Sequence, residues 1–195
     1  MNGTSDPDAG APLSDEPRDI GAVQVETVYR GAVWNITDER FRLGGHELDR
    51  QVLRHPGSVA ILALDDQDRV ALVRQYRHPV AARLWEIPAG LLDVPGEPLA
   101  AAAARELHEE IDRSAEVWEP LISFYSSPGG SDELVHVFRA RGLHELAPFP
   151  REAEEAEFEY AWAPFPEMVE AVLAGRLRSP SLVAGVLAES ARRSR

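Results

Sequence analysis

Three glutamates close together on one predicted helix are the residues best suited to chemistry in this 195-residue chain. They are Glu106, Glu109 and Glu110. The surrounding stretch 98–111 is rich in Ala and Leu, which favours a helix. At about 100° per residue, Glu110 lies about 40° from Glu106 on the helix surface, and Glu109 lies about 60° away on the other side. The three carboxylates therefore share one edge of the predicted helix.

Carboxylates at this spacing repel one another, so a nearby positive charge is expected. At an effective dielectric constant of ~20, two like charges ~4 Å apart cost about 4 kcal/mol, and less where water surrounds them. Oxygen ligands without cysteine or a suitably spaced histidine pair favour Mg²⁺ or Mn²⁺ over zinc. The alternative is a solvated helix face on which Arg105 pairs with Glu109 one turn away. The helix alone leaves both interpretations open.

The segment before the helix favours the metal site. Residues 85–97 read WEIPAGLLDVPGE, which is the pattern of a strand end, a loop rich in Gly and Pro, and a helix start. Such a loop can turn backbone carbonyl and amide groups toward a metal–phosphate complex. We therefore expect the loop and the helix to form one site.

Strands are predicted on both sides of this helix, which favours an α/β (α+β) sandwich. Period-2 patterns indicate strands over residues 23–29, 34–43, 47–53, 58–64, 70–76, 121–125, 134–140 and 158–162. Hairpin turns are expected at Gly44-Gly45 and over 65–68. Two further helices are predicted over 167–174 and 181–191, each with a proline near its start. Residues 1–20 are rich in Gly, Asp, Pro and Ser and are expected to form a disordered tail.

Composition and charge exclude several classes of protein. The 33 acidic and 20 basic residues leave a net charge of −13, which argues against a general grip on nucleic acid or an anionic membrane. No apolar run approaches the ~20 residues of a membrane span. The absence of cysteine excludes a disulfide framework and a thiol nucleophile. With no secretory signal visible, we expect a cytoplasmic protein.

The residues that suggest a metal site also resemble the Nudix box, G-x5-E-x7-R-E-U-x-E-E-x-G-U, in which U is a bulky apolar residue. Gly90 opens the match, Glu97 is its first glutamate, and Arg105 follows after the required seven residues. Three positions depart from the pattern. Six residues rather than five separate Gly90 from Glu97, Asp112 replaces the later glycine, and Arg113 replaces the last apolar residue. The last two departures concern the end of the helix more than the glutamates before it.

Over most of residues 20–188 the chain resembles the ADP-ribose pyrophosphatase branch of this family. The resemblance lies in VRQYRH at 73–78, LWEIPAG at 84–90, SPGGSDE at 127–133 and AGVLA at 184–188. It implies a Nudix α/β/α sandwich with a mixed sheet over 57–195. It also implies a small antiparallel sheet over 21–56 that is exchanged in a homodimer and completes the partner's pocket.

The same resemblance implies roles for individual residues around the metal. The implied ligands are the Ala89 carbonyl and the carboxylates of Glu106, Glu109, Glu110 and Glu155. Gly90, Glu97 and Arg105 are implied to be structural, with Glu97 holding Arg105 in an ion pair. The implied catalytic residues are Glu155, favoured as the general base, Glu154 as its alternative, and Glu109. Without the resemblance, the acidic stretch 151–157 would be interpreted as an ordinary solvated loop.

Substrate contacts are also implied by position. Arg77 and Glu86 occupy family positions near the terminal ribose and phosphate, and Arg50 is placed to reach the partner's site. The alternative for these three is a surface ion pair. The remaining candidates are Trp34 for stacking on adenine, against simple packing, and Ser131 and Asp132 beside the ribose.

The function expected from this resemblance is Mg²⁺-dependent hydrolysis of ADP-ribose, or a related nucleoside diphosphate sugar, to AMP and ribose 5-phosphate. Mn²⁺ is expected to substitute for Mg²⁺. The partners expected are a small nucleotide-sugar substrate and a second copy of the chain, with no nucleic acid and no membrane. Two alternatives remain: a pyrophosphatase for another nucleotide, and a non-hydrolytic nucleotide-sugar sensor, which the unusual Asp112 and Arg113 suggest.

Overall fold

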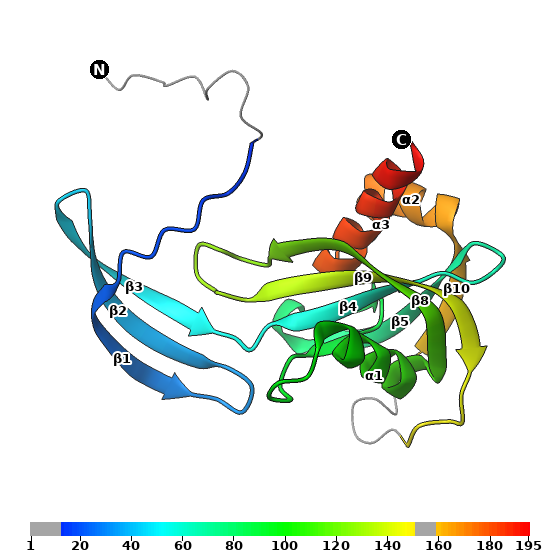
Figure 1. The fold of residues 1–195 in the computed structure, drawn as a ribbon, viewed down its shortest axis with the longest axis horizontal. Helices are drawn as coiled ribbons and strands as arrows, with labels where there is room; N and C mark the ends of the chain where they lie inside the picture. Colours follow the sequence, from blue (N-terminus) through cyan, green and yellow to red (C-terminus); the bar gives the residue numbers. More distant parts are fainter. Residues whose placement is uncertain (1–12, 151–158) are drawn as a thin grey trace.

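The computed structural model describes residues 13–150 and 159–195. Within these residues the chain forms three β sheets and three α helices, and Figure 1 shows an N-terminal sheet standing to one side of a larger α/β body. The strands are β1 (Ala22–Arg30), β2 (Asn35–Leu43), β3 (His46–Arg54), β4 (Ser58–Ala63), β5 (Arg69–Arg77), β6 (Ala82–Glu86), β7 (Ala89–Leu91), β8 (Arg113–Tyr125), β9 (Leu134–Glu145) and β10 (Glu159–Pro164). The helices are α1 (Leu99–Ile111), α2 (Phe165–Leu173) and α3 (Pro180–Arg193), with a short 3-10 turn at His78–Val80.

The sheets have the mixed organisation that the sequence predicted. The N-terminal sheet has the antiparallel order β1-β2-β3, a second sheet has the order β10-β5-β6, and a third has the order β7-β4-β9-β8. In the third sheet β4 and β9 are parallel, whereas the other pairs are antiparallel. The turn between β2 and β3 uses Gly44 and Gly45 at φ 59° and 84°, a backbone region that favours glycine.

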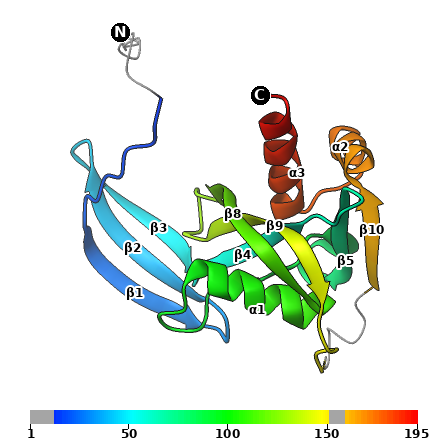
Figure 2. The ribbon, with the colours of Figure 1, turned by 45° about the vertical axis from the view of Figure 1, so that its right-hand side comes forward.

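The core lies on both faces of β4, because helices cover each face. Every residue from Val59 to Ala63 has an exposed fraction of 0%. One face packs on α1 through residues that include Ala103 and Leu107, and the other packs on α3 through Leu182 and Val186. Figure 2 shows α1 and α3 on opposite sides of the sheets. The predicted sandwich is confirmed.

Two parts of the strand prediction were incomplete. The short strands β6 and β7 were read as a strand end and a loop, since β7 has only three residues and depends on pairing with β4. Strand β8 starts at Arg113 rather than near Leu121, because a register shift between Pro120 and Ile122 interrupts the alternation along it.

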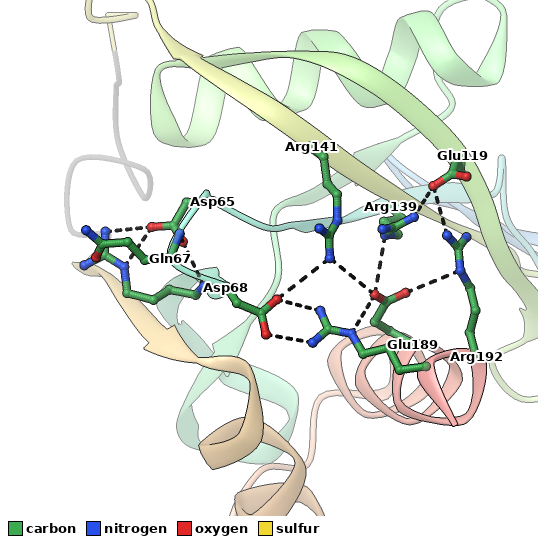
Figure 3. A network of polar contacts seen from close by, with 10 residues as sticks. Asp65, Gln67, Asp68, Glu119, Arg139, Arg141, Glu189 and Arg192 are labelled. Atoms are coloured by element: carbon green, nitrogen blue, oxygen red, sulfur yellow. Dashed lines mark hydrogen bonds and ion pairs between the residues drawn. The ribbon is translucent and has the colours of Figure 1, made fainter. Parts of the chain in front are cut away.

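Near its C-terminal end, α3 carries a buried carboxylate that is surrounded by arginines (Figure 3). Glu189 is 1% exposed and accepts a hydrogen bond from Arg193 Nε at 2.9 Å. Arg139 and Arg141 approach the same carboxylate from β9 at 3.4 and 3.7 Å. Arg193 also forms two hydrogen bonds of 2.7 Å to Asp68, in the loop between β4 and β5. The network therefore connects α3 to strand β9 of the third sheet and to the loop between β4 and β5.

Candidate metal and substrate site

Two of the predicted ligand glutamates lie against strand β7. Glu106 and Glu110 of α1 are 9% and 8% exposed. The backbone N–H of Ala89 donates a hydrogen bond to Glu110 Oε2 at 3.1 Å. At Gly90 the backbone passes so close to Glu106 that an added Cβ would lie 1.9 Å from Glu106 Cδ. The helix and the loop strand thus meet at two carboxylates and a glycine backbone.

Burial raises the pKa values of these two carboxyl groups. Desolvation is the main cause that raises the pKa of Glu110 to about 8, and the nearby carboxylate of Glu106 adds to it. Desolvation likewise raises the pKa of Glu106, with further contributions from Glu109 and Asp93. Two buried carboxylates whose raised pKa disfavours their charged forms are the kind of arrangement that a hard divalent cation would stabilise.

Arg105 organises the glutamates on the outer side of this pair. Its guanidinium donates to both oxygens of Glu97, at 3.2 and 3.0 Å, which is the ion pair that the sequence suggested. It also donates to Glu106 Oε1 at 2.6 Å and to Glu109 Oε2 at 3.2 Å. These acceptors, Glu97 first, raise the pKa of Arg105 above its ordinary value. Arg105 therefore holds three carboxylates in fixed positions.

Only two of the three glutamates of α1 face strand β7. Among the residues that the structure describes, no group of three or more His, Asp or Glu side chains could hold a metal ion. Glu106 and Glu110 face β7, whereas Glu109 is 26% exposed at its side chain and bonds to Arg105. The donor set nevertheless suits Mg²⁺ or Mn²⁺, because the side chains that meet at β7 offer carboxylate oxygens and no sulfur.

An ion pair between an exposed arginine and a buried glutamate lies next to Glu110. Arg77 donates to Glu86 through Nε at 2.9 Å and through a terminal nitrogen at 2.7 Å, and Glu86 is 7% exposed. The charges of this pair act on Glu110, since Arg77 lowers its pKa and Glu86 raises it. The two predicted substrate residues therefore form a bidentate ion pair close to Glu110 of α1.

A cavity of about 1070 Å³ lies next to the Arg77–Glu86 pair and the β7 backbone, whereas the helix carboxylates Glu106, Glu109 and Glu110 are not among the residues that line it. Its lining includes Arg77, Glu86, Ala89 and Gly90, which the sequence placed in the site. The other lining residues are Val33, His55, Ser58, Pro79, Val80, Leu84, Leu91, Ser126, Glu133, Val135, Ser179, Pro180 and Ser181. They come from the third sheet, from β6 of the second sheet, from the 3-10 turn, from the start of α3 and from connecting loops, so the cavity depends on tertiary packing.

Several predicted residues are not in this cavity. Arg50 lies on the N-terminal sheet, where it lines a separate polar hollow of about 390 Å³. Trp34 is 38% exposed and packs against Tyr29, with ring centroids 6.1 Å apart. Ser131 accepts a hydrogen bond from the N–H of Glu133, and Asp132 bonds to Arg54 and to the N–H of His55. Ser131 and Asp132 thus shape the loop rather than line the cavity. Glu154 and Glu155 lie outside the described residues.

Glu133 is a cavity residue that the sequence reasoning missed. Its carboxylate accepts hydrogen bonds from Ser58 Oγ at 3.1 Å and from Ser126 Oγ at 2.6 Å. Its Oε1 lies 3.9 Å from His55 Nδ1. Its position directly after Asp132 in the same loop could have suggested Glu133 as a site residue. The sequence does not show which of the two side chains faces the cavity.

The chain is similar in sequence to known proteins. Residues 54–183 match the family model described as NUDIX domain. The chain is 42% identical over 171 residues to an ADP-ribose pyrophosphatase of Mycobacterium tuberculosis. The matched region covers 87% of this chain and 83% of the relative. It is 40% identical over 134 residues to an ADP-ribose pyrophosphatase of Bacillus subtilis, covering 68% of this chain and 71% of the relative.

A solved structure shares the fold at low identity. A protein described as an ADP compounds hydrolase superposes with a TM-score of 0.77 and 20% identity, covering 93% of this chain and 97% of the other. No helix within residues 13–150 and 159–195 combines the length and apolar character needed to cross a bilayer.

Proposed function

The chain belongs to the Nudix family of pyrophosphohydrolases, and from this premise we propose that it hydrolyses ADP-ribose to AMP and ribose 5-phosphate with the help of Mg²⁺ or Mn²⁺. Related nucleoside diphosphate sugars are the neighbouring substrate class. The two ADP-ribose pyrophosphatases that share at least 40% identity with the chain support this choice of substrate.

The observation that carries the proposal is the meeting of Glu106 and Glu110 with the Ala89–Gly90 backbone. Two buried carboxylates lie against a glycine backbone that carries no side chain, which brings oxygen donors suited to a divalent cation next to the cavity wall at Ala89 and Gly90. We assign Glu106, Glu110 and the Ala89 carbonyl to the metal, with Glu109 as a further ligand or neighbour. A divalent cation bound there would supply Lewis acidity toward the phosphoryl oxygens and a more acidic water.

The protein's own groups have three tasks in this reaction. Arg105 keeps the helix carboxylates in place through its bonds to Glu97, Glu106 and Glu109. A general base must take a proton from the attacking water. We assign that task to Glu155, with Glu154 as its alternative, both in the stretch outside the described residues. In the cavity the Arg77–Glu86 pair offers guanidinium nitrogens toward a phosphate and a carboxylate toward sugar hydroxyls.

We propose that the enzyme works as a homodimer in which the N-terminal sheet serves the partner's site. All nine residues of β1 are exposed, and its apolar side chains Val23, Val25 and Val28 are 47% to 62% exposed. Such a strand is expected to be covered by a second copy. In that arrangement Arg50 and Trp34, which lie away from their own cavity, reach the substrate of the other subunit. A cytoplasmic location remains our expectation.

The departures in the helix motif do not favour the sensor alternative. Asp112 adopts a left-handed conformation, with φ 56°, and its N–H bonds to His108 O at 2.9 Å, so α1 ends in an ordinary cap. Arg113 pairs with Glu145 at 2.8 Å on the neighbouring strand. Both replacements are therefore accommodated without displacing Glu106 or Glu110.

The direct test is product analysis with the purified protein. We expect ADP-ribose with Mg²⁺ to yield AMP and ribose 5-phosphate in equal amounts, resolved by ion-exchange chromatography. A panel of ADP-glucose, NADH and dinucleoside polyphosphates tests the substrate class. Cleavage of a dinucleoside polyphosphate with ADP-ribose left intact would refute the substrate assignment. Tight binding of ADP-ribose without turnover in either metal would instead favour a sensor.

A further inference from the structure

Two serines at the start of α3 line the large cavity with unpaired hydroxyl groups. Ser179 is 4% exposed and directly precedes the helix, and Ser181 lies in its first turn. A serine before a helix commonly caps it, but the side chain of Ser179 makes no cap hydrogen bond. Across residues 13–150 and 159–195, neither hydroxyl has a hydrogen-bond partner. Because a buried hydroxyl without a partner is unfavourable, we expect Ser179 to find its partner inside the cavity.

The backbone of the same helix turn also has unused donors. Pro180 carries no N–H, and the first hydrogen bond of the turn runs from Val183 N–H to the Ser179 carbonyl oxygen at 2.9 Å. Within the part of the chain that the structure describes, no acceptor pairs with the N–H groups of Ser181 and Leu182. The start of a helix also carries a partial positive charge. This end of α3 therefore combines hydroxyl and amide groups that suit the oxygen atoms of a ligand.

Packing fixes the start of α3 beside strands that carry other cavity residues. Leu182 is fully buried in the same core cluster as Val135, and Ala89 packs against this cluster. At Gly185 an added Cβ would lie 3.3 Å from Val137 Cγ1, so α3 lies close to β9. Figures 1 and 2 both show this end of α3 next to β9. Val135 and Ala89 also line the cavity, so the start of α3 belongs to the same binding space as the β7 backbone.

The other serines of the described cavity lining already use their hydroxyls within the protein. Ser58 Oγ and Ser126 Oγ both donate to the carboxylate of Glu133, at 3.1 and 2.6 Å. Among the serines of this lining, Ser179 and Ser181 thus keep their hydroxyls available to a ligand.

The charges around the cavity favour a neutral ligand group at this place. Arg77 and Glu86 pair through two hydrogen bonds, so their charges oppose each other. The ring of His55 accepts the N–H of Gly57 at Nδ1, which is a bond of the neutral imidazole. Glu133 therefore gives the described lining a negative charge, which disfavours an additional anion. A neutral group with several hydroxyls, such as a sugar, suits both this charge and the free groups of α3.

We propose that the start of α3 forms a hydroxyl-binding subsite for the neutral sugar on the far side of the diphosphate, with Ser179 and Ser181 as specificity-determining residues. The inference rests on the proposed function, which places the diphosphate beside the Ala89–Gly90 backbone. From this backbone the cavity extends to the two serines. A ligand hydroxyl bound there supplies the partner that the Ser179 hydroxyl does not have within the described chain.

Two nonhydrolysable analogues isolate the contribution of the distal sugar. In both, a methylene group replaces the bridging oxygen of the diphosphate. One is the analogue of ADP-ribose, and the other is the analogue of ADP, which lacks the sugar. With Mg²⁺ present, we expect Ser179→Ala to raise the Kd of the ADP-ribose analogue about 5- to 10-fold, because a hydrogen bond to the sugar is lost. The Kd of the ADP analogue should stay within about twofold. Equal effects on both analogues, or no effect on either, would overturn the proposal.

Further variants and kinetics check the same assignment. Ser181→Ala should raise the Kd of the ADP-ribose analogue about two- to fivefold, since this serine is less buried. Ser190→Ala removes a hydroxyl of the same helix outside the cavity lining and should change neither Kd. In turnover assays, Ser179→Ala should raise KM for ADP-ribose while kcat stays within about threefold of wild type. A lower kcat at unchanged KM would contradict a role in binding the sugar.

Thermal melting separates sugar binding from a structural role of Ser179. Loss of a buried hydroxyl that has no partner should not lower the melting temperature of the free protein, whereas loss of a helix cap would lower it. A lower melting temperature of Ser179→Ala together with unchanged binding of both analogues would assign the serine to the helix and overturn the proposal.

A charged sugar tests whether the subsite prefers a neutral group. ADP-ribose that carries a phosphate on its distal sugar should bind at least about fivefold more weakly than ADP-ribose, measured by displacement of the ADP-ribose analogue. Tighter binding of the phosphorylated compound would assign the helix start to a phosphate and overturn the neutral-sugar subsite.

The subsite and the proposed function can fail separately. A wild-type protein that binds the ADP-ribose analogue more tightly than the ADP analogue, but leaves ADP-ribose intact, would refute the hydrolysis and retain the subsite. A wild-type protein that hydrolyses ADP-ribose, but binds the two analogues equally well, would refute the subsite alone. Binding of neither analogue would refute both.

Discussion

The carboxylate of Glu106 occupies the space that any side chain at position 90 would need. An added Cβ on Gly90 would lie 1.9 Å from Glu106 Cδ and 2.1 and 2.2 Å from its two oxygens. Real Cβ atoms do not approach other atoms so closely, so either the strand or the glutamate would have to move. The glycine at position 90 is therefore required by the close approach of Glu106 on α1.

This relationship predicts that Gly90→Ala disables the enzyme without unfolding it. We expect kcat/KM for ADP-ribose to fall at least about 100-fold, because a displaced Glu106 no longer faces Ala89 and Glu110. The control is Gly129→Ala, since an added Cβ at Gly129 would meet nothing within 4 Å. Near-normal kinetics in Gly90→Ala would contradict the assignment of Glu106 as a ligand.

Removal of the metal, or of one ligand charge, should separate activity from stability. We expect EDTA to abolish hydrolysis and added Mg²⁺ or Mn²⁺ to restore it. In Glu110→Gln, the amide oxygen can still accept the bond from Ala89 N–H, and no charge is buried. The variant should therefore melt at or above the wild-type temperature in the absence of metal, while kcat falls at least about 1000-fold. Turnover that persists in EDTA would rule out the metal mechanism.

The proposed exchange of the N-terminal sheet predicts complementation between two inactive variants. Arg50→Ala lacks the residue that would reach the partner's site, and Glu110→Gln lacks a ligand in its own site. When the two are unfolded together and refolded as an equal mixture, random pairing should restore about a quarter of the wild-type activity. Each mixed dimer then contains one complete site.

If Arg50 acted within its own subunit, no mixed dimer would be complete and the mixture would stay inactive. Light scattering on the wild-type protein provides the parallel check, because a monomer at the assay concentration would exclude the exchange. The control mixture combines Glu110→Gln with Gly90→Ala, which lie in the same site and should not complement each other.

Acid should weaken the attachment of α3 through Asp68. The two hydrogen bonds from Arg193 are the main cause that lowers the pKa of Asp68 below its ordinary value. A carboxyl with a depressed pKa stabilises the fold above its unfolded pKa, near 3.9, and this contribution is lost as the pH falls through the folded value. Asp68→Asn should therefore be less stable than wild type in urea at pH 7, with the gap closing at lower pH.

The size of this effect should be modest, because the side chain of Asp68 is 45% exposed and water screens the pair. Asparagine suits the left-handed backbone at φ 58°, so the substitution does not strain the turn. Asp66→Asn, at the exposed neighbouring position, serves as the control. A stability gap that is the same at pH 7 and pH 3 would show that the charge of Asp68 does not contribute.

The features that depend on short-range spacing could be predicted from the order of the residues. The helix of Glu106 and Glu110 follows from helix-forming residues and a period of about 3.6. The hairpin at Gly44-Gly45 and most strands follow from local turn chemistry and alternation. The resemblance to the Nudix box from Gly90 to Arg105 could also be recognised, because the motif spans only 16 consecutive positions. Local preferences and local spacing were sufficient for each of these.

Contacts between residues that are distant in the chain could not be predicted in this way, because they depend on how the elements pack. Glu133 faces inward where Asp132 binds Arg54, Arg77 pairs with Glu86 across two strands, and Asp112 reaches Phe149. Nothing in the spacing of these residues reports the contact, since each depends on the register of strands or on a chain crossing from a distant element. Facing directions in loops are set by packing and by hydrogen-bond satisfaction across the whole fold, and these are not local properties.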